Sequence, residues 1–185
     1  MDWLPVFAFL ATASLALIGY LVTHWLEVRR EQRRARLERV NRQLGELYGP
    51  LLALVSSGEE AWTAFRSHYR AGLKFWLSDP PPTDDEAAAW RLWMREVFMP
   101  LNLRVEDVIV GKADLLDEDE MPMPFLQLVA HVAAYKTVLK RWDQKDFADN
   151  IALLPFPRSY LLPLVQERFA LLKQEQQKLL GELSP

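Results

Sequence analysis

His131 is the residue of this chain whose type and surroundings best fit a chemical role. Tyr135 follows it by four residues, so both side chains lie on one face if the segment is helical. An imidazole beside a phenol in a helical bundle could transfer a proton or bind a small ligand. The alternative is a histidine at the edge of an apolar face, bonded to a neighbouring carbonyl. The spacing therefore marks His131 and Tyr135 as a possible pocket and leaves both interpretations open.

The rest of the sequence lacks the motifs that carry catalysis. It has no cysteine, which excludes disulfides, thiolate nucleophiles and cysteine-bound metals. It contains no glycine-rich phosphate loop, no HExxH and no GxSxG, and none of its three histidines lies three residues after a glutamate. The acidic run at 117–120 lacks the alternating ligands and central glycine of a calcium loop. We therefore predict no catalytic, cofactor-binding or metal-binding residues and a protein that is not an enzyme.

An uncharged segment near the start of the chain predicts a membrane anchor. Residues 3–26 are 24 consecutive residues without a formal charge, and as a helix they would span about 36 Å. That length exceeds the roughly 30 Å hydrocarbon core of a bilayer. A cleaved signal peptide is the alternative, but no basic residue precedes the segment and its apolar stretch is too long for one. We predict that residues 1–27 form a single transmembrane helix in contact with the lipid bilayer.

Charged and aromatic residues predict how this helix is oriented. Aromatic rings prefer the headgroup level at both ends of a span. The stretch 27–42 carries seven arginines and three glutamates, whereas no lysine or arginine precedes the span. Because positive charge marks the cytoplasmic side of a membrane helix, we expect the N-terminus outside and the C-terminal domain in the cytoplasm. The residues predicted at the membrane interface are Trp3, Tyr20, Trp25, Arg29, Arg30, Arg33 and Arg34.

The segment that follows the anchor is expected to continue as a helix. No proline occurs in residues 6–49, so residues 28–48 are predicted to form a basic helical stalk. Apolar residues then recur at near-heptad spacing, as in a coiled coil, and predict one buried helical face over 37–55. That face could be covered within the chain, by a second copy or by a membrane-protein partner. Its members are Leu37, Val40, Leu44, Leu47, Leu51 and Val55.

The remaining residues, 49–185, predict a cytoplasmic bundle of about four or five helices. Glycine is scarce and alternating β-branched residues are almost absent, which favours helices over strands. Gly49-Pro50 can kink or divide a helix, and the prolines at 80–82 break one. Thr83 and Glu86 then fit a capping box that begins the next helix. The predicted fold class is therefore all-α, with an anchor, a stalk and a bundle.

The function follows from these elements only as a hypothesis. The stretch 70–77 joins basic and aromatic residues, so Leu73, Phe75 and Trp76 are a possible partner contact, with core packing as the alternative. A formal net charge of −3 argues against nucleic-acid binding. We expect a membrane-anchored helical protein that acts as an accessory, assembly or scaffolding subunit at the cytoplasmic face. The alternative is a membrane-tethered enzyme or small-molecule sensor whose pocket lies near His131 and Tyr135.

Overall fold

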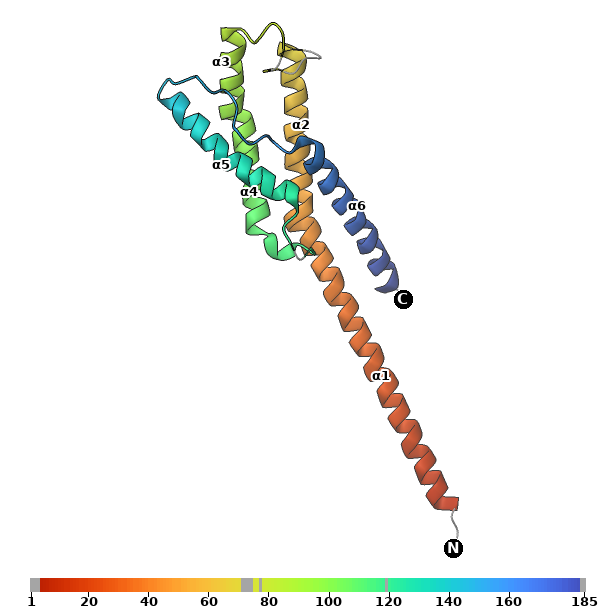
Figure 1. Ribbon diagram of the computed structural model, residues 1–185. Helices are drawn as coiled ribbons and strands as arrows, with labels where there is room; N and C mark the ends of the chain where they lie inside the picture. The colour runs from red at the N-terminus through yellow and green to blue at the C-terminus, as the bar shows by residue number, and fades with distance from the viewer. Residues whose placement is uncertain (1–3, 71–74, 77, 119, 184–185) are drawn as a thin grey trace. The chain divides into compact units, whose positions relative to one another are not determined.

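The computed structural model confirms the all-α fold class. It describes residues 4–70, 75–76, 78–118 and 120–183, without the side chains of residues 4–8, 10–13 and 182–183. All regular secondary structure in these residues is helical (Figure 1). Within that described part of the chain, no helix is both long enough and apolar enough to cross a membrane. The chain divides into two compact units, residues 1–41 with 174–185 and residues 42–173, which we describe separately.

The first unit contains most of the helix α1 (Leu4–Arg42) and the end of α6 (Arg158–Leu183). The Arg36 guanidinium forms an ion pair with Glu175, with an Nε–Oε1 distance of 2.6 Å. The Gln176 amide donates to the Asn41 side-chain oxygen at 2.6 Å. Every described side chain between residues 14 and 26 is exposed, although most of them are apolar. This part of α1 therefore presents an apolar surface on all its sides.

Two π-helical turns each precede a proline, and the chain stays helical on both sides of that proline. They are η1 (Gln43–Tyr48), directly before Gly49-Pro50, and η2 (Met94–Phe98), directly before Met99-Pro100. In each turn the closing N–H bonds the carbonyl five residues earlier, from Gly49 to Leu44 and from Met99 to Met94. A proline ring clashes with the carbonyl four residues before it in an α-helix, and the wider π turn changes that spacing. The predicted break at Gly49-Pro50 is therefore a π turn within a continuous helical run.

The second unit is a helical bundle. In chain order its main helices are α2 (Gly49–Tyr69), α3 (Asp84–Trp93), α4 (Met99–Gly111), the short η3 (Ala113–Leu115) and α5 (Met123–Asp143), followed by the first part of α6. Helix α4 packs against both α2 and α5 (Figure 1). The predicted capping box is confirmed at the start of α3, where Thr83 Oγ1 accepts from the Glu86 N–H and the Glu86 carboxylate accepts from the Thr83 N–H.

The core of the bundle is rich in aromatic rings. Phe65 is fully buried at its centre, and its ring lies 4.7–6.1 Å from six neighbouring rings. Contacts of this kind add to the stabilisation that comes from burying apolar area. In this unit the near-heptad face is buried as predicted at Leu44, Leu47, Leu51 and Val55; in the first unit Val40 is buried and Leu37 half-buried. The six rings around Phe65 belong to Trp62, Tyr69, Phe75, Trp90, Trp93 and Phe98.

Candidate functional site

A cavity of about 280 Å³, half open to the surface, lies in the bundle, and both His131 and Tyr135 line it. Helices α2, α3, α4 and α5, the turn η2, the residue Trp76, the irregular segment before α6 and the first residue of α6 supply its wall. The two predicted residues also contact each other, with ring centroids 5.4 Å apart in an edge-on arrangement. Five other aromatic rings line the cavity, those of Trp62, Trp76, Trp90, Phe98 and Phe156. Tightly packed interiors hold few voids larger than one water molecule, so this cavity is the strongest candidate for a site.

The protonation state of His131 follows from its hydrogen bond. Its Nδ1 lies 2.7 Å from the carbonyl oxygen of Leu154. A carbonyl only accepts, so Nδ1 carries the hydrogen and Nε2 is the acceptor of the neutral ring. Burial lowers the pKa of His131 below its usual value, and the bond to Leu154 opposes that shift only in part. His131 therefore faces the cavity as a neutral hydrogen-bond acceptor.

Neighbouring aromatic side chains hold the irregular segment 144–157 against the bundle. The Tyr135 hydroxyl and the Trp90 indole N–H both donate to the carbonyl oxygen of Asn150, at 2.8 and 2.7 Å. The Trp142 indole N–H donates to the carbonyl oxygen of Asp149 at 2.8 Å. Desolvation raises the pKa of Tyr135, so its hydroxyl keeps its proton. The donors of these side chains are therefore used by the backbone of the segment.

The charged groups of the cavity wall neutralise each other. Arg158, at the start of α6, forms an ion pair with Glu59 of α2. The same guanidinium lies 4.7 Å from the centroid of the Trp62 ring, a distance suited to a cation–π contact. Because one positive and one negative group are paired, the wall offers no unpaired charge to a ligand.

Two further residues of the wall, Trp76 and Gly58, lack a contact that such residues usually make. The indole N–H of Trp76 is buried and has no hydrogen-bond partner among the described residues. Such a donor loses the bond that it would make to water. Gly58 lies within helix α2, and a Cβ atom built on it meets no other atom within 4 Å. Since Gly58 lines the cavity, its missing side chain leaves part of that space empty.

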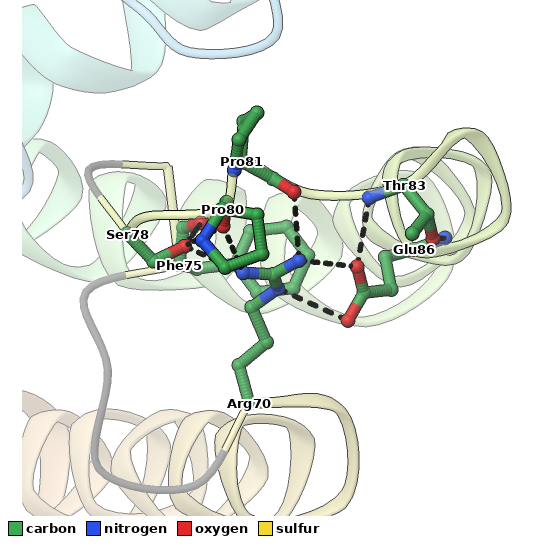
Figure 2. A network of polar contacts seen from close by, with 7 residues as sticks. All are labelled: Arg70, Phe75, Ser78, Pro80, Pro81, Thr83 and Glu86. Atoms are coloured by element: carbon green, nitrogen blue, oxygen red, sulfur yellow. Dashed lines mark hydrogen bonds and ion pairs between the residues drawn. The ribbon is translucent and has the colours of Figure 1, made fainter.

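The Arg70 side chain binds residues of the stretch 78–86, which follows Phe75 and Trp76 (Figure 2). Its Nε and Nη2 donate to the two carboxylate oxygens of Glu86 at 3.0 and 2.7 Å. Its remaining hydrogens go to Ser78 Oγ and to the carbonyl oxygens of Pro80 and Pro81, at 2.6–2.8 Å. All five N–H groups of the guanidinium are thus satisfied by its own chain. We assign this network a structural role, because it leaves Arg70 no donor for a ligand.

The other residues singled out from the sequence are placed as follows. Phe75 is buried in the aromatic core rather than on the surface, and Leu73 lies outside the described residues. Among the predicted interface residues, Trp3 is also outside them, whereas Tyr20 and Trp25 are exposed on α1. The Arg29 guanidinium lies 3.7 Å from the centroid of the Trp25 ring. Of the remaining three arginines, Arg30 and Arg34 are exposed and Arg33 is half-buried.

Sequence reasoning missed most of the cavity wall. The neighbours Gly58 and Trp62 on α2, Asn102 on α4 and the segment 151–156 carry no catalytic motif, and the three elements are far apart in the chain. The indirect signal was a glycine in the middle of a helix, where it costs about 1 kcal/mol relative to alanine. Among the described residues no three histidine, aspartate or glutamate side chains are grouped as metal ligands would be. The chain matches no protein-family model, and comparison with curated proteins and with solved structures gives no significant match.

Proposed function

We propose that this protein is a membrane-anchored helical protein that acts as an accessory, assembly or scaffolding subunit at the cytoplasmic face of a membrane. The observation that carries the proposal is the apolar surface of α1. Leu15, Leu17, Ile18 and Tyr20 lie on different sides of this helix and are each 56–70% exposed. A helix that is apolar all round is typically covered by a bilayer or by a protein core.

The residues around this surface support an anchor and its orientation. The uncharged run in the sequence extends from Trp3 to Leu26 and is long enough to span a bilayer. The stretch 27–42 that follows carries seven arginines and three glutamates. By the positive-inside rule, that side faces the cytoplasm. Trp25, with the Arg29 guanidinium over its ring, is suited to the headgroup region at this end.

The irregular segment after α5 is a better binding surface for a partner protein than the near-heptad face. That face is buried within the single chain, so a partner would have to displace the core to reach it. By contrast, Leu153 is 99% exposed, and Ile151 and Leu154 are about half-exposed beside it. The bonds from Trp90 and Tyr135 to the Asn150 carbonyl hold the segment in place. Apolar side chains presented by an ordered segment bind at a low entropic cost.

Charge insertion tests the anchor directly. Leu15→Arg combined with Ile18→Arg places two charges in the apolar run, each costing about 2.5–3.5 kcal/mol near the centre of a bilayer. The double variant should leave the alkali-resistant membrane fraction, whereas Leu15→Ala with Ile18→Ala should stay in it. Equal recovery of the arginine variant and the full chain in the membrane fraction would contradict the anchor.

Replacement of the anchor tests the tether. Proteins that co-purify with the chain in mild detergent are compared for the full chain, for a deletion of residues 1–26 and for a chimera with an unrelated membrane helix. Tethering raises the effective concentration near membrane partners, so the chimera should keep the partners that the deletion loses. Loss in the chimera alone would mean that the α1 surface itself binds the partner. Full retention by the deletion would contradict the tethered scaffold.

The cavity favours a second candidate function, a membrane-tethered small-molecule sensor or enzyme. Ligand sites are concave, mostly apolar and carry few polar groups, and the cavity around His131 and Tyr135 has these features. The two candidates differ in what His131 contributes. His131→Asn, which keeps a donor near the Leu154 carbonyl, should leave a pure scaffold active, whereas it should impair a protein that works through the cavity.

A further inference from the structure

From the cavity wall we infer the chemical class of its ligand: a neutral, flat aromatic molecule of two fused rings that carries a hydrogen-bond donor. This inference rests on the proposed role as a small-molecule sensor or enzyme, and it names the class of molecule that the site selects. The size of the cavity, the rings that line it and the polar groups left unused inside it each restrict the class.

The cavity volume restricts the size of the ligand. An engineered protein cavity of about 150 Å³ admits one benzene ring. The present cavity is about 280 Å³, close to twice that volume. Two fused rings therefore fill the space, whereas a larger polycyclic molecule would extend out of its open side.

The rings of the wall favour a flat aromatic molecule over an aliphatic one. Trp62 and Trp90 meet edge-on with centroids 5.8 Å apart, and Trp76 meets Trp90 edge-on at 6.0 Å. Rings set at right angles present both faces and edges, so an inserted ring can stack on one wall and meet another edge-on. Gly58 leaves room on the α2 side, where any larger residue would enter the space.

The unused acceptor of His131 requires a donor on the ligand. His131 donates its only N–H hydrogen, on Nδ1, to the Leu154 carbonyl, and its Nε2 remains an acceptor. Tyr135 donates its hydrogen to the Asn150 carbonyl, and the Trp90 indole N–H lies against its oxygen, so Tyr135 offers little to a ligand. A hydroxyl or ring N–H on the ligand satisfies the Nε2 acceptor of His131.

The charges of the wall exclude an ionic ligand. Glu59 and Arg158 neutralise each other, so a carboxylate or ammonium group would meet no net opposite charge in the wall. Burying an unpaired charge is far more costly than burying a neutral hydroxyl. The geometry therefore selects neutral molecules.

Four related probes test this class against the full chain in lipid nanodiscs, with empty nanodiscs as the blank for partition into lipid. 2-Naphthol carries a donor, 2-methoxynaphthalene carries only an acceptor, naphthalene carries neither, and 2-naphthoate is an anion. Equilibrium dialysis should give saturable one-to-one binding of 2-naphthol. Loss of one hydrogen bond should weaken 2-methoxynaphthalene and naphthalene by about threefold to tenfold, and 2-naphthoate should bind least.

Substitutions at Gly58 and His131 locate the bound probe. Gly58→Leu fills the empty space and should reduce 2-naphthol binding by at least about tenfold, a loss of about 1.4 kcal/mol. Gly58→Ala is the matched control and should bind within about threefold of the unaltered chain, a change of well under 1 kcal/mol. His131→Asn keeps a donor near the Leu154 carbonyl but removes the Nε2 acceptor. It should lower the affinity for 2-naphthol to that for naphthalene, even if Gly58→Leu fails to fold.

The possible results separate this inference from the function on which it rests. Equal binding of naphthalene and 2-naphthol would overturn the donor requirement while the cavity remained a binding site. Tighter binding of 2-naphthoate would overturn neutrality in the same way. Binding of no probe would overturn both the ligand class and the second candidate function. Unchanged binding in folded Gly58→Leu would place the ligand elsewhere and overturn the inference.

Discussion

His131 Nδ1 donates to the carbonyl oxygen of Leu154 across a distance of 2.7 Å. The two residues are 23 positions apart, and the bond joins helix α5 to the irregular segment that follows it. It also sets the tautomer of the ring, because a carbonyl has no hydrogen to donate. One buried bond therefore both holds the segment and leaves an acceptor beside the cavity.

His131 should make the stability of the bundle depend on pH near neutrality. Burial lowers its pKa below the ordinary value of 6.5, so the unfolded chain binds its proton first as the pH falls. The contribution of neutral His131 to the free energy of unfolding is complete above its ordinary pKa. It is lost as the pH falls through the lowered pKa of the folded state. Urea unfolding at pH 7.5 and pH 5.5 should show a larger loss for the unaltered chain than for His131→Asn. Equal losses would mean that His131 ionises without hindrance in the folded state.

Gly49 should be required in the first π turn. A Cβ atom at this position would lie 2.4 Å from the backbone oxygen of Leu44, far inside contact distance. Gly49→Ala should therefore destabilise the bundle by about 1–3 kcal/mol, as overpacking does. Gly45, in the same turn, has no atom within 4 Å of such a Cβ. Gly45→Ala should be neutral or stabilising by up to about 1 kcal/mol, and chemical denaturation of the two variants measures the difference.

Glu86 should make part of the stability sensitive to acid. The hydrogen bonds from Arg70, with those from Thr83, lower the pKa of Glu86 from 4.5 to about 2. The contribution of the ionised Glu86 carboxylate to stability is present above its ordinary pKa. It is lost as the pH falls toward the lowered pKa of the folded state. The melting temperature of the unaltered chain should exceed that of Glu86→Gln at neutral pH, and the difference should shrink as the pH falls from about 5 to 2. A difference that stays constant over this range would contradict the Arg70–Glu86 network.

Leu47 should be among the most costly side chains to truncate. It is fully buried in η1 on the near-heptad face. Leu47→Ala should cost about 2–5 kcal/mol of unfolding free energy, as for other buried leucines. Leu92 is the matched control, because it is 60% exposed on α3, and Leu92→Ala should change stability by less than about 0.5 kcal/mol. Similar values for the two variants would mean that the face is not part of the folded core.

The local features of this fold were predictable because they depend on neighbours in the chain. The capping box of Thr83 and Glu86 follows from a three-residue spacing, and the structure confirms it. The buried face from Val40 to Val55 follows from the period of a helix, and the structure buries it. The π turn at Gly49-Pro50 was not predictable, because the spacing indicates only that a proline disturbs the helix.

The sequence by itself determined that the chain is helical, and it placed His131 and Tyr135 on one helical face. Only the tertiary structure decided that this face borders a cavity with Gly58 and Trp62 on its other side. Helical periodicity reports which side of a helix is buried, but not which distant segment covers it. The path of the segment 144–157 depends on donors from α3 and α5, and no periodic pattern records such a path. The tautomer of His131, and with it the chemistry of the site, therefore depends on a contact that only the folded chain makes.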